Sequence, residues 1–291
     1  MDKKNFFVKS HGLGNEYIVF DCSNITFDIN TPNIEKICNI HFGIGSDGIL
    51  LVESSSVADF KFRVFNPDGS EAEKSGNGLR IFAKYIFDYG YTCKRHFTIE
   101  TMAGIVEATI NKERNGKAEI ITIDIGKAIF EPKQIPVNCD LPECIDFPLT
   151  IDGKIFKINC ISVGNPHCVI VTDTLDEQLV KEFGPKIENH PMFPNRINIQ
   201  FVKVLSDKAI QMLIWERGAG FTLASGSSSS AAATMMHKKG LVGKEIDVNM
   251  LGGQLHISVD ESWNIRLCGE VQQVAEGWLS EEYVESLTKN I

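Results

Sequence analysis

The sequence of 291 residues contains an internal repeat in which the second copy follows the first at a constant offset. Ser75 and Ser225, the clearest matched pair, lie 150 residues apart. Other features share this register without a gap: the dipeptides at 14–15 and 164–165, the runs at 60–65 and 210–215, Asn66 and Glu216, and the Ser-Gly pairs at 75–76 and 225–226. A fixed period marks one structural unit used twice. The repeat therefore predicts two half-domains of similar fold that face each other across a cleft.

Short strand-like runs fill much of each copy. Residues 60–65 alternate apolar and basic side chains, which is the period of a half-buried strand. Turn residues separate the runs at short intervals, so a mostly antiparallel β-structure is expected. The other predicted strands are residues 17–21, 105–110, 120–125, 168–172, 198–204 and 210–215.

Two helices are predicted, each directly after a Ser-Gly turn. The first covers about residues 77–89, and its polar side is limited to Arg80, Lys84 and Asp88. A helix with so narrow a polar side must lie largely buried. The second covers about residues 228–239 and ends in cationic residues before Gly240, which suits the negative end of a helix dipole. The expected fold class is α+β.

Composition excludes several classes of protein. Hydrophobic residues make up 43 % and charged residues 23 % of the chain, the balance of a soluble globular protein. No apolar run approaches the roughly 18 residues of a membrane span, and residues 1–7 lack the apolar stretch of a secretory signal. The net charge of −9, without a Lys/Arg block, argues against nucleic acid and anionic membranes as partners.

The eight cysteines are scattered along the chain. In a chain of this size they indicate reduced thiols in a cytosolic protein rather than disulfide staples. The nearest pair, Cys139 and Cys144, lacks a second pair at zinc spacing. No metal site is therefore expected.

The two repeated serines suggest a chemistry. Ser75 and Ser225 each precede a helix, whose first N–H groups are unpaired and carry the positive end of the dipole. Two such helix starts could hold a carboxylate and place one hydroxyl on either face of the bound molecule. This arrangement suits an enzyme that removes a proton from one face of a carbon and returns one to the other. The simpler interpretation of a single Ser-Gly is helix capping, but the pair in repeat register favours the functional one.

Several longer motifs carry a family resemblance. They are residues 11–15 (HGLGN), 42–48 (FGIGSDG), 65–70 (FNPDGS), 75–80 (SGNGLR), 164–167 (GNPH), 193–198 (FPNRIN) and 215–220 (WERGAG). Along nearly its whole length the sequence resembles the diaminopimelate epimerase family, the cofactor-independent amino-acid isomerases. The resemblance implies two pseudo-symmetric halves, each a curved, mostly antiparallel β-sheet around a central helix. We expect residues 1–125, completed by 277–291, to form one half and residues 126–276 the other.

The resemblance also implies roles for individual residues. In the family, positions 75 and 225 are cysteines that act as thiolate base and thiol acid on opposite faces of the substrate α-carbon, and His167 and Glu216 assist them. Asn15, like His167 and Glu216, belongs to a motif that lines the site. The implied donors to the α-carboxylate are Gly76, Asn77, Gly226 and Ser227. The distal amino-acid end of the substrate would be held by Asn66, Asn165, Asn198 and Arg217, of which arginine can bind a carboxylate bidentately.

Taken alone, three of these residues have simpler interpretations. His167 would more often be a strand-edge histidine with its hydrogen bonds satisfied, and Asn66 in Asn-Pro-Asp-Gly is typical of a turn. Arg217 before Gly-Ala-Gly could be an exposed turn charge. Only the joint match favours a function for them.

The chain departs from the family pattern at both acid/base positions, which are Ser75 and Ser225. A cysteine thiol has a pKa of about 8.5, whereas an unactivated hydroxyl is closer to the ~15.7 of water. The difference is roughly 10 kcal/mol at ~1.36 kcal/mol per unit, and a helix dipole supplies only about 1–2 kcal/mol. Proton transfer through these serines is therefore expected to be very slow. Gly48, Phe221 and the serine run 227–230 are smaller departures.

Three functions remain open at this point. The first is an LL-/meso-diaminopimelate epimerase scaffold of lysine and cell-wall precursor synthesis, impaired by replacement of both cysteines. The second is a divergent isomerase or lyase that uses Glu216 or His167 on another small amino acid, and the third is a non-catalytic amino-acid binder. The first is favoured because Asn66, Asn165, Asn198 and Arg217 are all present. It would be a cytoplasmic enzyme without metal or pyridoxal phosphate, and a homodimer is common in the family.

Overall fold

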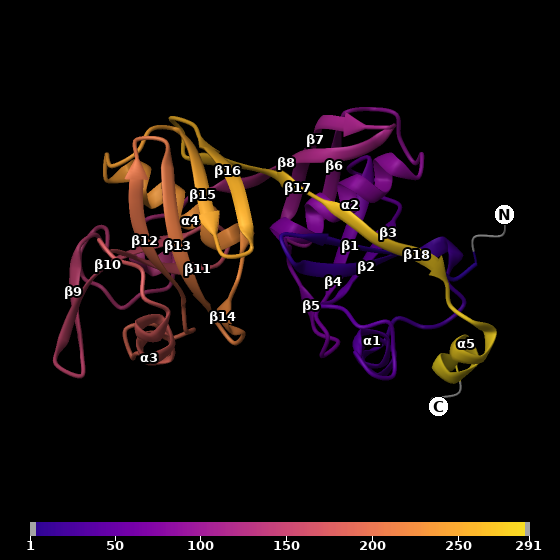
Figure 1. Cartoon of the computed structure of the whole chain (residues 1–291), viewed down its shortest axis with the longest axis horizontal. Coiled ribbons are helices and arrows are strands. Elements are labelled where there is room, and N and C mark those ends of the chain that lie inside the picture. The colour runs from indigo at the N-terminus through magenta and orange to yellow at the C-terminus, as the bar shows by residue number, and fades with distance from the viewer. Residues whose placement is uncertain (1–3, 289–291) are drawn as a thin grey trace. The chain divides into compact units, whose positions relative to one another are not determined.

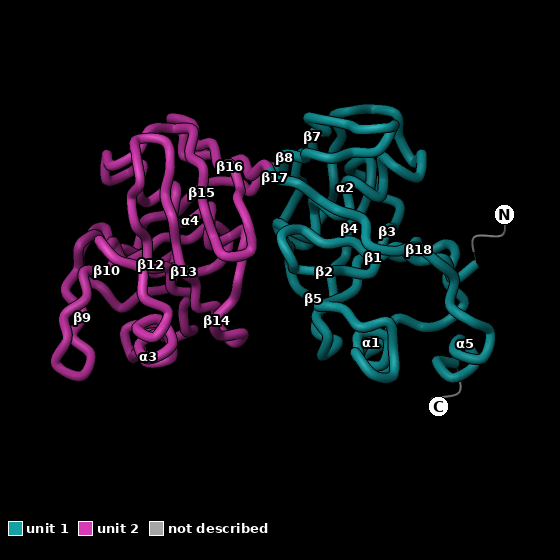
Figure 2. Tube along the Cα trace, in the orientation of Figure 1, with its two compact units in different colours: residues 1–123, 269–291 teal, residues 124–268 magenta. Residues whose placement is uncertain are grey.

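The computed structural model describes residues 4–288, and the chain divides into two compact units. The first unit comprises the described residues up to Ile123 and those from Gly269 onward, and the second comprises Asp124–Cys268. Figure 2 shows the two units in different colours. The first unit therefore includes residues 269–276, which the sequence analysis assigned to the other half.

In the first unit, a curved sheet surrounds one helix. Hydrogen-bonded neighbours follow the order β18–β1–β2–β3–β4–β6–β7–β8, with β5 also paired to β4. Only the pairs β2–β3 and β4–β6 among these are parallel. The elements are β1 (Phe6–Gly12), β2 (Asn15–Asp21), η1 (Cys22–Asn24), α1 (Thr31–Cys38), β3 (Ile49–Glu53), β4 (Phe60–Phe65), β5 (Glu71–Ala72), α2 (Gly76–Asp88), β6 (His96–Thr101), β7 (Gly104–Arg114), β8 (Lys117–Lys127), β18 (Gln272–Trp278) and α5 (Glu281–Thr288) (Figure 1).

The second unit repeats this topology element by element. Its neighbours follow the order β9–β10–β11–β12–β13–β15–β16–β17, with β14 also paired to β13. The pairs β11–β12 and β13–β15 are parallel, at the places that β2–β3 and β4–β6 occupy in the first unit. The elements are η2 (Pro132–Gln134), β9 (Phe147–Ile151), β10 (Lys154–Ser162), β11 (Pro166–Val171), α3 (Glu177–Glu188), β12 (Asn198–Ser206), β13 (Ala209–Glu216), β14 (Gly220–Thr222), α4 (Gly226–Lys238), β15 (Glu245–Met250), β16 (Gly253–Val259) and β17 (Asn264–Glu270). The predicted α+β class with a repeated half is confirmed.

The two central helices keep the offset of the sequence repeat at both ends. α2 packs against β1, β2, β3, β4 and β7, and α4 packs against β10, β11, β12, β15 and β16. Both are largely buried, as the narrow polar side of α2 predicted. Within α2, the buried Lys84 forms an ion pair of 2.8 Å with Asp88. Both helices begin slightly earlier than predicted, at Gly76 and Gly226.

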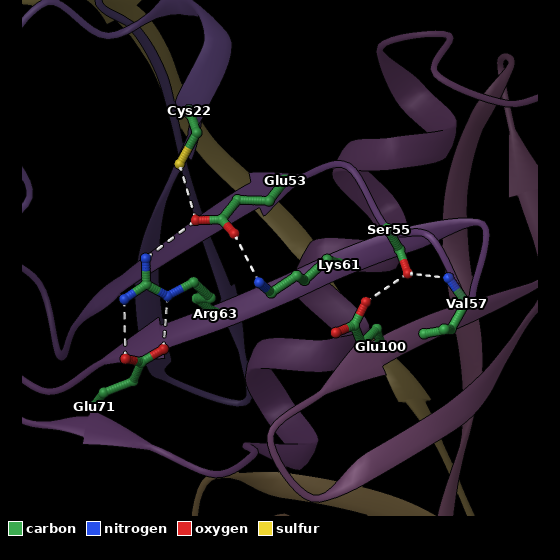
Figure 3. Close-up of polar contacts among 8 residues, drawn as sticks. All are labelled: Cys22, Glu53, Ser55, Val57, Lys61, Arg63, Glu71 and Glu100. Atoms are coloured by element: carbon green, nitrogen blue, oxygen red, sulfur yellow. Dashed lines mark hydrogen bonds and ion pairs between the residues drawn. The ribbon is translucent and has the colours of Figure 1, made fainter.

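At two positions matched by the repeat, the sheets of the two units carry different side chains. In the first unit, Arg63 on β4 donates to both Glu53 on β3 and Glu71 on β5, and Glu53 also pairs with Lys61 (Figure 3). Burial opposes ionisation of Glu53, but its hydrogen bonds to Arg63 and Lys61 keep its pKa lower than usual. In the second unit, the positions that match Arg63 and Glu71 are the apolar Leu213 and Phe221, which pack in the core beneath α3.

Two sequence expectations concern metals and membranes. Within residues 4–288, no helix is long and apolar enough to cross a membrane. Over the same range, no group of three or more His, Cys, Asp or Glu side chains is arranged to hold a metal ion. All eight cysteines are free thiols.

Candidate active site

The hydroxyl of Ser75 lies at the start of α2 in the first unit. Ser75 has an extended backbone and caps the helix, and its Oγ accepts a hydrogen bond of 3.0 Å from the N–H of Gly78. The phenol oxygen of Tyr17, on β2, lies 3.3 Å from the same Oγ. Ser75 is thus an N-cap residue and is also held by a second hydroxyl.

A chain of amides and charged groups extends from this helix start. Asn77 donates to Asn15 Oδ1 at 3.1 Å, and Asn15 donates to Asp47 Oδ2 at 2.9 Å. Arg80, fully buried, donates to Asn77 Oδ1 at 2.7 Å and to the carbonyl of Gly76 at 3.3 Å. The chain fixes the orientation of both asparagine side chains near the first N–H groups of α2.

Ser225 takes the matching place in the second unit, but its partner is a carboxylate. Its Oγ donates to Glu216 Oε2 at 3.0 Å and accepts from the N–H of Ser228 at 3.4 Å. Thr222 donates to the other oxygen of Glu216 at 2.8 Å. Strand β13 ends at Glu216, and the hairpin between β13 and β14 places this residue beside Ser225 at the start of α4. A hydroxyl hydrogen-bonded to a carboxylate is the pairing needed for general-base chemistry.

His167 lies fully buried on β11 within the same network. Its Nε2 contacts Asn165 Oδ1 at 2.8 Å, and its Nδ1 contacts Gln200 Nε2 at 3.0 Å. Because an amide NH₂ group can only donate, Nδ1 is the acceptor and Nε2 carries the proton. Gln200 Nε2 also donates to Ser228 Oγ at 3.0 Å. His167 is therefore held as a neutral imidazole with a defined tautomer.

The repeat extends to the side-chain contacts themselves. The bond from Asn77 to Asn15 in the first unit is matched by one from Asn165 to Ser227 Oγ at 3.5 Å in the second. The bond from Arg80 to the carbonyl of Gly76 is matched by one from Ser230 to the carbonyl of Gly226 at 2.9 Å. The two helix starts are thus built on one plan with different side chains.

The residues predicted to hold the distal end of the substrate do not form one hydrogen-bonded group. Asn198 accepts from the N–H of Arg217 at 3.0 Å and donates to the carbonyl of Pro166 at 2.8 Å. Arg217 is exposed, and its guanidinium donates to the carbonyl of Asn195 at 3.1 Å. Asn66, in the first unit, donates to Ser70 Oγ at 3.0 Å within its own turn.

The structure therefore brings some of the predicted residues into contact within each unit. In the first unit these are Ser75, Gly76, Asn77 and Asn15, and in the second Ser225, Gly226, Ser227, Glu216, His167 and Asn165. Asn198 and Arg217 contact each other, and Asn66 contacts its own turn. Their roles toward a substrate remain predictions.

The sequence analysis gave no site role to several residues that touch these networks. Asp47 anchors Asn15, Gln200 holds His167, and Thr222 holds Glu216. Tyr17, which contacts Ser75, was placed only in a predicted strand. The repeat register contained the signal for Tyr17, because it occupies the position that His167 occupies in the second copy.

Burial shifts the pKa values of two site residues. Desolvation raises the pKa of Glu216 above its usual range, although the hydrogen bonds from Thr222 and Ser225 act in the opposite direction. Desolvation also lowers the pKa of His167 to about 3, with a smaller contribution from the charge of Arg217. Glu216 is thus a stronger base than an exposed carboxylate, and His167 is neutral at physiological pH.

Sequence comparison decides the family. A family model described as Diaminopimelate epimerase matches residues 7–131 and 159–274. The chain belongs to the diaminopimelate epimerase family. Diaminopimelate epimerase 2 of Nostoc sp. is 47 % identical over 277 residues, which cover 95 % of this chain and 96 % of that protein. Diaminopimelate epimerase of Acetivibrio thermocellus is 43 % identical and covers 93 % of this chain and 97 % of its own. Membership makes the chain an isomerase of the amino-acid epimerase type.

Solved structures share the fold at much lower identity. A hydroxyproline epimerase from Agrobacterium vitis matches with a TM-score of 0.70 and 14 % identity over 100 % of this chain and 99 % of its own. A phenazine biosynthesis protein from Bacillus anthracis matches with a TM-score of 0.65 and 18 % identity over 94 % of this chain and 98 % of its own. These likenesses support the two-unit α+β fold found here.

Proposed function

We propose that this protein interconverts LL- and meso-diaminopimelate by proton transfer at one α-carbon, with Ser75 and Ser225 in the acid and base positions. The names of the relatives support the substrate, and the identities of 43–47 % over most of the chain support a shared activity. The observation that carries the reaction is the contact of 3.0 Å between Ser225 and Glu216 at the start of α4. It provides a hydroxyl with an acceptor for its proton.

In this proposal Glu216 is the base and acts through Ser225. Ser225 Oγ takes the α-proton of the substrate while its own proton moves to Glu216 Oε2. The raised pKa of Glu216 makes the carboxylate a better acceptor. The first N–H groups of α2 and α4, with Gly76, Asn77, Gly226 and Ser227, would bind the α-carboxylate. Arg217, with Asn66, Asn165 and Asn198, would bind the distal carboxylate and amine.

The reaction is proposed to be slow. Ser225 must give its proton to Glu216 as it takes the α-proton, and a hydroxyl is less acidic than a thiol by up to about 7 pKa units, or roughly 10 kcal/mol. Each cysteine restored at position 75 or 225 should therefore recover part of the rate. We expect the enzyme to work in the cytoplasm without metal or pyridoxal phosphate, as a homodimer, and without nucleic-acid or membrane partners.

Isotope exchange tests the proposal directly. The wild type and the Ser75→Cys/Ser225→Cys double variant are incubated with LL-diaminopimelate in deuterated water, and deuterium at the α-carbon and formation of the meso isomer are measured. We expect slow exchange in the wild type and an increase of several orders of magnitude in the double variant. If the double variant showed no gain, the site would belong to another isomerase or lyase, or to a binder.

The carboxylate gives the reaction a pH dependence. As the base, Glu216 must be ionised, so the exchange rate should rise as pH increases through its raised pKa and then level off. Glu216→Gln keeps the shape and removes the base, and is expected to lower the rate by about 10²–10⁴-fold and to abolish this rise. Measuring exchange from pH 4 to 8 in both proteins checks the prediction. An unchanged profile in Glu216→Gln would assign the base elsewhere.

A further inference from the structure

Tyr17 contacts the Ser75 hydroxyl and has no place in the mechanism described above. It lies on β2 with 7 % of its surface exposed, and its phenol oxygen is 3.3 Å from Ser75 Oγ. By the repeat register it matches His167, so the two units present different chemistry at equivalent positions. The first unit places a phenol in direct contact with its helix-capping serine, whereas the imidazole of the second unit is linked to Ser225 through Asn165 and Ser227.

The space for the Tyr17 ring is created by Gly48. A Cβ at this position would lie 2.8 Å from Tyr17 Cε1 and 2.3 Å from the carbonyl oxygen of Phe65. Gly48 also has a φ of +155°, in the region that favours glycine. This glycine, one of the departures from the family pattern, therefore allows the ring to lie where its hydroxyl reaches Ser75.

The hydrogen bonds are compatible with opposite polarity at the two serines. Ser225 Oγ donates to Glu216, so its own hydrogen points to the carboxylate and a lone pair remains for an incoming proton. Ser75 Oγ already accepts from the N–H of Gly78. If Tyr17 fills its other lone pair as a donor, the Ser75 hydrogen is left to point toward a substrate. The second unit then provides a proton acceptor and the first a proton donor.

We propose that Tyr17 is the positioning and proton-relay residue of the acid half of the reaction, an inference that rests on the function proposed above. Ser75 gives its hydroxyl proton to the α-carbon and takes the phenolic proton of Tyr17. The tyrosinate that remains regains a proton from water. No oxidant or cofactor is consumed, and one proton enters at the carbon for the one that Glu216 received.

The acidity of a phenol is suited to this step. A tyrosine phenol has a reference pKa of about 10, against ~15.7 for an unactivated hydroxyl, so a phenol is in general the better proton source of the two. General acids of this kind contribute about 10²–10⁴-fold to a rate. With a cysteine at position 75 the thiol is itself acidic enough, and the phenol should matter little.

A partition experiment separates this role from the rest of the site. In the Ser225→Cys variant, a thiol removes the α-proton efficiently, but inversion still needs a proton from the side of Ser75. LL- and meso-diaminopimelate are each incubated with this variant in deuterated water, and the ratio of inversion to exchange with retention is measured by mass spectrometry and chiral separation. Adding Tyr17→Phe, which keeps the ring, is expected to lower that ratio by about 10²-fold and to leave exchange unchanged.

Two comparisons exclude a merely structural effect. Tyr85→Phe removes another buried hydroxyl of the same unit, one that contacts Tyr91 at 3.3 Å, and should leave the ratio unchanged. In the Ser75→Cys/Ser225→Cys background, Tyr17→Phe should change inversion by less than about 3-fold, because the thiol has replaced the relay.

The outcomes separate the two proposals. Either of two results would overturn the role of Tyr17 while leaving the proposed reaction in place. In one, Tyr17→Phe lowers inversion equally in both backgrounds, and in the other it leaves the ratio of inversion to exchange unchanged in Ser225→Cys. No exchange of either isomer by Ser225→Cys would overturn the proposed reaction, and the role of Tyr17 with it.

Discussion

At the scale of single residues, the buried groups of the second unit make stability depend on pH. His167 is neutral in the folded protein because burial lowers its pKa to about 3, whereas an unfolded histidine titrates near 6.5. Below pH 6.5 the unfolded chain therefore binds a proton that the folded chain does not. The free energy of unfolding should fall by up to about 1.4 kcal/mol per pH unit between pH 6.5 and about 3 from this residue alone, and be constant above pH 6.5.

Replacing His167 by Gln should remove that contribution. The difference in unfolding free energy between variant and wild type, measured by denaturant titration, is expected to narrow as the pH falls from 7 to 4.5. The slope of unfolding free energy against pH is compared, rather than the free energy at one pH, because the substitution also removes the hydrogen bonds to Asn165 and Gln200. His96→Gln, which changes an exposed histidine, is the matched control. A difference that stays constant with pH would show that His167 is not held neutral.

Single residues also show how far the sequence could predict the site. Ser75 and Ser225 stand out because they share one repeat register and precede predicted helices. The partner of each serine could not be found in the same way, since Glu216 reaches Ser225 through a hairpin and Tyr17 reaches Ser75 from a strand 58 residues away. Such contacts depend on strand register and on the space beside Gly48, neither of which is encoded locally.

At the scale of elements, the two central helices end in the same way, and this can be tested as a matched pair. Gly90 after α2 and Gly240 after α4 have φ values of +74° and +69°, and a Cβ at either would meet nothing within 4 Å. The cost of alanine is therefore conformational, about 1–2 kcal/mol at each position. Thermal or denaturant unfolding of Gly90→Ala and Gly240→Ala should show similar losses. Gly243→Ala, at a glycine without a positive φ, should be neutral or slightly stabilising.

Some elements were predicted from the sequence and others were not, and local sequence signals account for the difference. The buried helices α2 and α4 follow clear Ser-Gly caps and end at glycines, so both were predicted within two residues of their starts. α3 contains Gly184 and Pro185 in its interior, which weakens the helical signal. Trp215 lies against Gly184, where a Cβ would approach the indole to 2.6 Å, so tertiary packing explains why this glycine stands within a helix. β18 lacks an alternating pattern because most of its residues are exposed at one edge of the first unit.

At the scale of the whole molecule, the chain completes its first unit with its last segment. β18 pairs with β1, and the N–H of Leu279 donates to the carbonyl of Asn5 at 3.1 Å. Beyond it, Tyr283 donates to the carbonyl of Lys36 at the end of α1, and Leu279 and Leu287 are buried in the core beside that helix. The second unit, by contrast, is one continuous segment from Asp124 to Cys268.

Deleting residues 271–291, which keeps β17 whole and removes β18 and α5, should therefore damage one unit only. The deletion removes β18, one of the two strand partners of β1, and two buried leucines, each of which contributes about 1.5–3 kcal/mol by burial. Hydrogen exchange of the truncated protein should show lost protection in β1 and α1, while β10–β13 and α4 keep theirs, because the strands that pair with β10–β13 all lie within Asp124–Cys268. The matching deletion of α5 alone, residues 281–291, should affect α1 and leave β1 protected. If β10–β13 lost protection to the same degree as β1, the two copies of the repeat would unfold as one cooperative body. The copies would then share a topology without being independently stable.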